Sequence, residues 1–435
     1  MFSSCNFIFA NKNGIMEKIS KAMDKAYSYE SDGELNITAY YNKKEMNIKG
    51  ITKQIFSKEK NSDLYFYSNN IIDIEHNNSK TSTKVIEAYN DGEYFFSHFS
   101  NKTGNRLRSS HTEKEFLEYY EKSSKSGDLL DGYSEISSSK NDDGNYEVLL
   151  TKYDSNKIKE INLIYGFPLK ANGASIVDLI VTILADSKYL VKEIDIQYIF
   201  SEDDHSGEQK ITYSNYGSAE KNLSDINTKF YTSVDDARAV PLLSSLLNDV
   251  AQAESGKVSS SSTFETMLMG VKNKSEETYN VSYGYDDGKF EYDVKAEIGE
   301  KKHSIEYKDG IYIKDEQKNE SYTEFEAKAF VKSLIDPYSY SSMSVRQVNV
   351  NRNDDGTTSY TFEVKPENTA LEEMLKQTFS SLSAGYMNAE VEINFVVKDD
   401  ELTSITYLIN STGQINYRNS TYMIGIDITT KLVFK

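Results

Sequence analysis

The stretch Glu193-Ile194-Asp195-Ile196-Gln197-Tyr198-Ile199-Phe200 alternates acid or amide side chains with apolar ones. A period of two is typical of a β-strand with one buried and one hydrated face. A second copy, Glu390-Val391-Glu392-Ile393-Asn394-Phe395-Val396-Val397, begins 197 residues later and aligns Ile194 with Val391. That spacing is too long for a solenoid repeat and suits a whole domain. The chain is therefore predicted to contain two copies of one antiparallel fold.

Local signals recur in the same order in both halves of the chain. They comprise Asp-Gly hairpin turns, Asn-Asp-Asp-Gly turns and capping boxes that start helices. They stand at Asp91-Gly92 and Asp309-Gly310, at Asn141–Gly144 and Asn353–Gly356, and at Thr112–Glu115 and Thr323–Glu326. The repeated order supports a duplicated fold.

Apolar spacing predicts helices between these turns. Helical spacing is seen over residues 15–28, over the strongly apolar run 176–184, over 264–271 and over 371–379. The polar residues 68–83 are predicted to form a loop. Four regions follow from this pattern. They are an N-terminal tail (1–14), a first domain (15–218), a helical and serine-rich linker (219–262) and a second domain (263–435).

Composition limits the partners and the location of the chain. The 68 acidic residues outnumber the 49 basic ones, which gives a net charge of −19. Such a charge repels nucleic acid and anionic lipid head groups, so neither is expected as an electrostatic partner. No apolar run is long enough to span a membrane as a helix. Cys5, the single cysteine, follows Phe2-Ser3-Ser4. This sequence fits either a lipidation site, and so a lipid anchor, or an ordinary thiol without a signal sequence before it.

The sequence lacks the common catalytic and metal-binding patterns. The five histidines lack metal-ligand spacing. The turns ending at Gly144 and Gly356 fail as calcium loops, because Leu150 and Phe362 stand where a bidentate glutamate is needed. No nucleotide-binding or nucleophile-elbow motif occurs. We therefore expect no cofactor, no metal site and no enzymatic activity, although an unrecognised pair of carboxylates stays open as a weak alternative.

The order of elements resembles the bacterial lipoprotein-carrier superfamily, which includes LolA, LppX and LprG. The residues that carry the resemblance are Ile15–Tyr41, Tyr89–Tyr94, Tyr189–Tyr216 and their second copies. The resemblance implies an α+β fold, with two tandem copies of an open antiparallel β half-barrel covered by helices. In such proteins the space between the sheet and the helices can hold acyl chains.

The functional expectation follows from that resemblance. The chain is expected to be a non-catalytic lipoprotein of the outer face of the cell envelope, or a secreted protein, that binds an apolar, lipid-like ligand between sheet and helices. The candidate cavity residues are Ile180, Leu184, Ile194, Ile196, Tyr198, Phe200, Leu375, Phe379, Val391, Ile393, Phe395 and Val397. The same residues would form a solid core if helix and sheet pack tightly. The alternative function is then a structural or protein-interaction module with a cell-surface protein partner.

Overall fold

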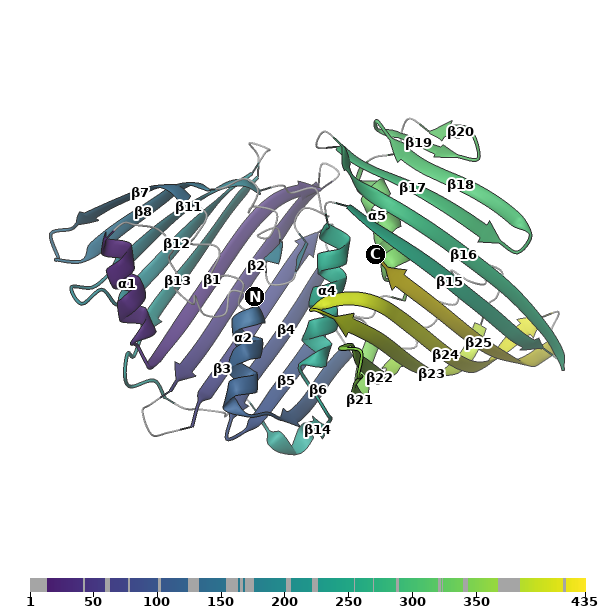
Figure 1. Cartoon of the computed structure of the whole chain (residues 1–435), viewed down its shortest axis with the longest axis horizontal. Coiled ribbons are helices and arrows are strands. Elements are labelled where there is room, and N and C mark those ends of the chain that lie inside the picture. The colour runs from purple at the N-terminus through teal and green to yellow at the C-terminus, as the bar shows by residue number, and fades with distance from the viewer. Residues whose placement is uncertain are drawn as a thin grey trace. The chain divides into compact units, whose positions relative to one another are not determined.

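Figure 1 shows the computed structural model of the chain. It describes residues 14–41, 44–58, 63–76, 79–100, 103–123, 133–153, 163–164, 167–168, 176–200, 205–220, 226–253, 255–268, 270–286, 289–319, 322, 324–338, 343–366, 384–417 and 420–435. The chain divides into two compact units. Unit 1 is Met1–Lys102 with Arg106–Tyr231, and unit 2 is Thr103–Asn105 with Thr232–Lys435.

The first large sheet is antiparallel and has the strand order β14-β6-β5-β4-β3-β2-β1-β13-β12-β11-β8-β7. Its elements are α1 (Gly14–Asp24), β1 (Ser28–Tyr41), β2 (Lys44–Ser57), β3 (Tyr65–His76), β4 (Ser79–Asn90), β5 (Glu93–Ser100), β6 (Thr103–Ser110), α2 (Glu113–Ser123), β7 (Tyr133–Lys140), β8 (Tyr146–Tyr153), β11 (Ile176–Ala185), β12 (Val191–Phe200), β13 (Ser206–Ser214) and β14 (Thr232–Ser233). A separate two-stranded pair is formed by β9 (Leu163–Ile164) and β10 (Phe167–Pro168).

Both faces of the first sheet carry packed side chains. On one face, α1 inserts Met16, Ile19 and Met23 into the main core, beside inward residues such as Leu35 of β1. Further along the same face, Phe116 of α2 stacks on Tyr89, with ring centroids 4.5 Å apart. The opposite face carries a smaller apolar cluster that the segment 226–231 covers. The two α-helices of this unit, α1 and α2, therefore lie on the same face of the sheet.

The second large sheet has the order β20-β19-β18-β17-β16-β15-β25-β24-β23-β22-β21. Its unit contains α4 (Ala239–Gln252), β15 (Ser255–Leu268), β16 (Val271–Asp286), β17 (Lys289–Ile298), β18 (Lys301–Lys308), β19 (Ile311–Lys314), β20 (Gln317–Asn319), α5 (Glu324–Ile335), β21 (Met343–Arg352), β22 (Thr358–Pro366), β23 (Ala384–Lys398), β24 (Glu401–Tyr417) and β25 (Ser420–Phe434). The helices α4 and α5 contact each other, and they lie against β24 and β17 respectively.

The two large sheets share one strand order once the two-residue β14 is set aside. In each unit a helix precedes six meandering strands, a second helix follows, and five strands then return to pair with the first. The equivalence extends to the register. Val181 of β11 pairs with Leu150 of β8, and Ile393 of β23 pairs with Phe362 of β22. Both members of the second pair are numbered 212 higher, the same offset that separates the two Asn-Asp-Asp-Gly turns.

This register corrects the alignment of the repeat. The stretch 193–200 lies on β12, whereas 390–397 lies on β23. By strand order, β23 corresponds to β11, and β12 corresponds to β24. The predicted match of Ile194 with Val391 is therefore wrong, because it aligns strands that are neighbours in the sheet. Neighbouring amphipathic strands share one alternation, so sequence similarity alone selected the wrong neighbour.

The predicted α+β class with helix-covered half-barrels is wrong. Strands dominate both units, and the described residues of each unit contain only two α-helices, of 11 to 14 residues. The run 176–184, predicted to be a helix, lies in strand β11, and the helix predicted over 264–271 is the end of β15 with the start of β16. The loop predicted over 68–83 belongs to β3 and β4.

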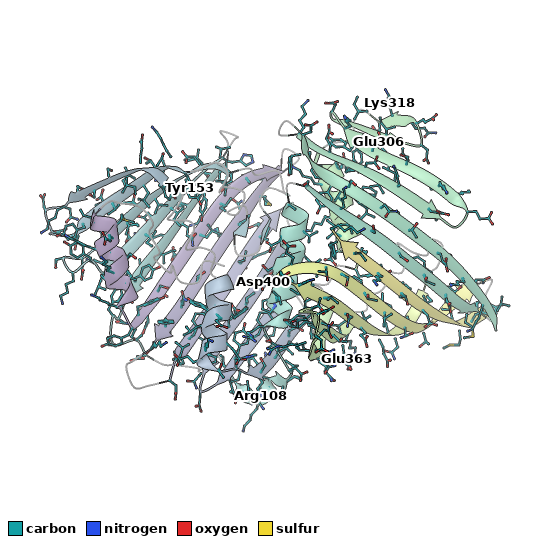
Figure 2. The ribbon with its side chains drawn as sticks, viewed as in Figure 1. Arg108, Tyr153, Glu306, Lys318, Glu363 and Asp400 are labelled. Atoms are coloured by element: carbon teal, nitrogen blue, oxygen red, sulfur yellow. The ribbon has the colours of Figure 1, made fainter. Side chains whose placement is uncertain are left out.

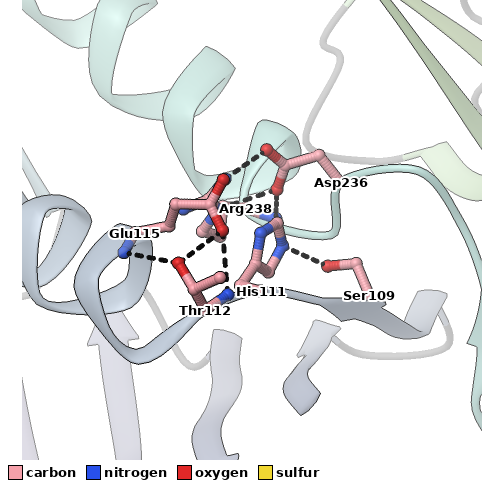
Figure 3. Close-up of polar contacts among 6 residues, drawn as sticks. All are labelled: Ser109, His111, Thr112, Glu115, Asp236 and Arg238. Atoms are coloured by element: carbon pink, nitrogen blue, oxygen red, sulfur yellow. Dashed lines mark hydrogen bonds and ion pairs between the residues drawn. The ribbon is translucent and has the colours of Figure 1, made fainter. Parts of the chain in front are cut away.

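Several local predictions are confirmed. Helix α1 covers most of the predicted 15–28. Asp91-Gly92 and Asp309-Gly310 have positive φ at both residues, as a type I′ hairpin turn requires. The capping box at the start of α2 is formed, because Thr112 N–H donates to Glu115 Oε2 at 2.8 Å and Glu115 N–H donates to Thr112 Oγ1 at 3.3 Å (Figure 3). Thr323, Cys5 and the helix predicted over 371–379 lie outside the described residues.

The expected linker, 219–262, contains regular structure. Helix α4 occupies the middle of this segment. The serine run of the segment lies in β15, so residue 263 falls inside a strand. Among the described residues, no helix is both long and apolar enough to cross a membrane.

Candidate functional site

The predicted cavity residues lie mainly in packed cores. Eight of them are buried, with at most 8% of the residue surface exposed: Ile194, Ile196, Tyr198, Phe200, Val391, Ile393, Phe395 and Val397. Ile180 and Leu184 lie half-buried on the other face of β11. Leu375 and Phe379 lie outside the described residues. None of the ten described residues lines the open pocket beside α1.

An open pocket of about 520 Å³ lies beside α1 in unit 1. Three segments far apart in the sequence form it, namely α1 with the residues after it, the turn between β11 and β12, and the residues that follow β13. Its lining residues are Lys18, Lys21, Ala22, Lys25, Ala26, Tyr27, Lys188, Tyr189, Leu190, Tyr216 and Gly217. We call it the α1 pocket.

The lysine stripe of α1 follows from the amphipathic pattern of the helix. Met16, Ile19 and Met23 are buried in the core and fix the rotation of the helix. Residues three apart share a helix face, so Lys18 and Lys21 come together on another face of α1, and Lys25 follows in the turn after the helix. The three ammonium groups are thereby directed along one wall of the α1 pocket.

The turn between β11 and β12 is held in a fixed conformation. Asp186 Oδ1 accepts hydrogen bonds from the N–H groups of Lys188 at 2.8 Å and Leu190 at 2.9 Å. Tyr189 has a φ of 68°, which is uncommon for a residue with a side chain and costs conformational energy. Its ring stacks on Tyr146, with centroids 4.6 Å apart. The aromatic wall of the α1 pocket is therefore preformed.

Contacts with α1 complete the wall. The Lys18 ammonium donates to Tyr189 Oη at 3.3 Å and lies 5.2 Å from the centre of that ring. Hydrogen bonds with Tyr146 and then with Lys18 lower the pKa of the Tyr189 phenol. Tyr216 Oη donates to the Val191 carbonyl at 2.6 Å, so this ring is also fixed.

The charges of the α1 pocket are unbalanced. Among the described residues that line it, four of eleven are lysines and none is acidic, in a chain with a net charge of −19. Lys21 forms an ion pair with Glu17 of the same helix. Lys25 and Lys188 form no ion pair within the described residues, and Asp186 is engaged by the backbone of its own turn. Lys18 already contacts Tyr189 and Lys21 already contacts Glu17, so Lys25 and Lys188 are the two further cations at the pocket.

Sequence reasoning missed this pocket. The lysine spacing 18, 21 and 25 was visible on a predicted amphipathic helix, but charged residues on a helix usually form only a hydrated face. Lys188 and Tyr216 join the stripe through the pairing of β11 with β12 and of β12 with β13. In the part of the chain that the structure describes, no group of three or more histidine, cysteine or acidic side chains is placed to hold a metal ion.

Comparisons with known proteins add no function. Neither a family model nor a curated protein matches the chain. A protein of unknown function from the DUF3598 family of Nostoc punctiforme is 8% identical with a TM-score of 0.14, over 97% of this chain and 99% of that one. A putative AttH from Nitrosomonas europaea is 8% identical with a TM-score of 0.13, over 94% and 92%. The translocator domain of the autotransporter NalP from Neisseria meningitidis is 5% identical with a TM-score of 0.12, over 96% and 93%. Such low similarity carries no inference, and the resemblance to lipoprotein carriers stays a prediction.

Proposed function

We propose that unit 1 is a non-catalytic binding module that holds a small amphiphilic anion in the α1 pocket. The proposal keeps the lipid-like ligand expected from the sequence and adds an anionic head group. It also places the ligand beside α1 instead of among the residues of β12. The observation that carries it is the set of four lysines, with no acid among the described lining residues, around one pocket of a strongly acidic chain.

Electrostatics favours an anion at this place. The net charge of −19 opposes the approach of an anion, so a local excess of lysines favours holding one. Lys25 and Lys188 come from different segments and flank the same pocket. An anion between them would gain charge-assisted hydrogen bonds without breaking an ion pair described in the structure.

The remaining lining residues favour an apolar tail. Tyr27, with 52% of its surface exposed, borders the pocket together with Leu190, Tyr216 and two alanines, one in α1 and one just after it. The stems of the lysines add further apolar surface. A volume of about 520 Å³ is within the usual range for small-molecule sites. An amphiphilic anion could therefore place its head group against the lysines and its apolar tail against the tyrosines.

The proposal is tested with octyl phosphate as the probe and isothermal titration calorimetry as the measurement. We expect wild type to bind octyl phosphate, and the double variant Lys25→Gln/Lys188→Gln to bind it about tenfold more weakly, equivalent to about 1.4 kcal/mol. The matched control Lys295→Gln/Lys431→Gln removes the same charge from exposed strand positions of unit 2 and should leave binding unchanged. Added salt should weaken binding.

Probe chemistry separates the proposal from its competitors. Octyltrimethylammonium has the same tail and the opposite charge, so it should not bind to the α1 pocket. Equal binding of both probes would show that the pocket recognises only the alkyl tail. The absence of octyl phosphate binding by wild type would favour the structural or protein-interaction alternative.

A further inference from the structure

A second pocket lies on the face of the first sheet opposite to α1 and α2. It has a volume of about 310 Å³ and is lined by side chains of β4 to β6 and of the segment 226–231. Lys84 and Arg106 supply its charges, and Phe99, Phe230 and Tyr231 supply its rings. No acid lines it. We call it the Arg106 pocket, and its residues are separate from those of the α1 pocket.

Arg106 differs from the next arginine on the same face of β6. Arg108, which is labelled in Figure 2, lies 3.5 Å from Glu93 and forms an ion pair with it. The guanidinium of Arg106 instead lies 4.9 Å from the centre of the Phe99 ring and 5.9 Å from that of Phe230. No carboxylate within the described residues forms an ion pair with it. Its charge is therefore held by aromatic rings, which leave its N–H groups available for an acceptor.

The aromatic walls are positioned by specific contacts. Tyr231 is buried, its hydroxyl lies 2.5 Å from Ser97 Oγ, and its ring meets Phe95 edge to face at 5.4 Å. Phe230, the preceding residue, is 65% exposed. The one-turn helix Thr228–Phe230 holds it there, capped by the side chain of Asn227. An exposed phenylalanine in a defined position beside a guanidinium leaves one apolar ring available for contact.

We propose that the Arg106 pocket binds a small planar carboxylate, with the carboxylate on the Arg106 guanidinium and an aryl ring against Phe230. Planar, forked donors match a carboxylate through two parallel hydrogen bonds, which an ammonium group cannot reproduce. Lys84 adds a second positive charge at the same pocket. The volume is near the lower end for ligand sites, so the ligand is small.

The test uses the full chain and the fluorescence of 2-naphthoate, because the chain has no tryptophan to interfere with naphthalene emission. We expect 2-naphthoate to bind about tenfold more tightly than 2-naphthamide, its uncharged counterpart. Arg106→Gln should weaken naphthoate binding about tenfold, and Arg106→Lys should weaken it clearly as well. The control Arg346→Gln changes an exposed arginine of β21 and should bind as wild type does.

Several results would overturn the proposal. They are equal binding of the acid and the amide, an unchanged affinity in Arg106→Gln, wild-type affinity in Arg106→Lys, or displacement of naphthoate by equimolar inorganic phosphate. Loss of binding in Lys25→Gln/Lys188→Gln would assign naphthoate to the α1 pocket and would likewise overturn it. Folding of each variant is checked by circular dichroism. If Arg106→Gln does not fold, Phe230→Ser, a substitution at an exposed position, takes its place. It should show the same loss of naphthoate affinity, and wild-type affinity in this variant would overturn the proposal.

Discussion

Glu87 is a buried carboxyl group in the aromatic layer beneath α2, with 4% of its surface exposed. Its Oε1 accepts hydrogen bonds from Tyr94 Oη at 2.6 Å and from Tyr119 Oη at 3.0 Å. Burial raises the pKa of Glu87, and the two hydrogen bonds oppose that effect only in part. A buried carboxyl group with a raised pKa favours the folded state at low pH, and this contribution is lost as the pH rises through the folded-state pKa.

Replacing Glu87 with glutamine should therefore remove a pH-dependent loss of stability. Glutamine keeps an oxygen acceptor for Tyr94 and Tyr119 but cannot ionise. Urea unfolding at a series of pH values should show wild type losing stability relative to Glu87→Gln as the pH increases above the ordinary glutamate range. Glu147→Gln, at an exposed position of β8, controls for the loss of one negative charge. A stability difference that stays constant with pH would contradict this account of Glu87.

Strand β11 shows why a strongly apolar run was predicted to be a helix. Its inward residues Leu179, Val181 and Ile183 are buried, but its outer face also carries apolar side chains, including Val177 and Ile180. A strand that is apolar on both faces loses its period of two and resembles a buried helix segment. The turns and caps were predictable, because Asp91-Gly92 and Thr112–Glu115 depend on local chemistry alone.

Substitutions at neighbouring positions of β11 test its strand geometry. Val181 is fully buried and pairs with Leu150 and Ile196, so Val181→Asp should lower the free energy of unfolding by about 3 kcal/mol or more. Ile180 is half-buried on the opposite face, so Ile180→Asp should cost about 1 kcal/mol. Chemical denaturation of the two variants measures both values. Equal losses would speak against the one-sided burial of this strand.

At the scale of the whole chain, the duplication could be predicted, but its alignment could not. The paired Asp-Gly and Asn-Asp-Asp-Gly turns identify two copies, and both sheets do share one strand order. The correct offset follows from the pairing of Val181 with Leu150 and of Ile393 with Phe362, which is long-range information. The α1 pocket and the Arg106 pocket depend on the same kind of pairing, because Lys188 and Arg106 reach them only through the order of strands.

The first strand of the second sheet begins before the expected domain start at 263. Val258 in the first half of β15 pairs with Phe434 and Val281. Helix α4, which ends shortly before this strand, buries Leu243 and Leu246, and its Val250 carbonyl accepts a hydrogen bond from Tyr283 Oη at 2.5 Å. A fragment 263–435 lacks all of these contacts, whereas a fragment 232–435 keeps them.

We therefore expect the fragment 232–435 to unfold cooperatively and the fragment 263–435 to be unfolded or much less stable. Fully burying one leucine is worth about 2 kcal/mol, so losing α4 and half of a central strand removes a large part of a typical domain's stability. Both fragments lack Thr103–Asn105, which makes the comparison a matched one. Circular dichroism with thermal unfolding provides the measurement. Equal melting temperatures would show that α4 and residues 255–262 contribute nothing to the second fold, and its start would then belong at 263.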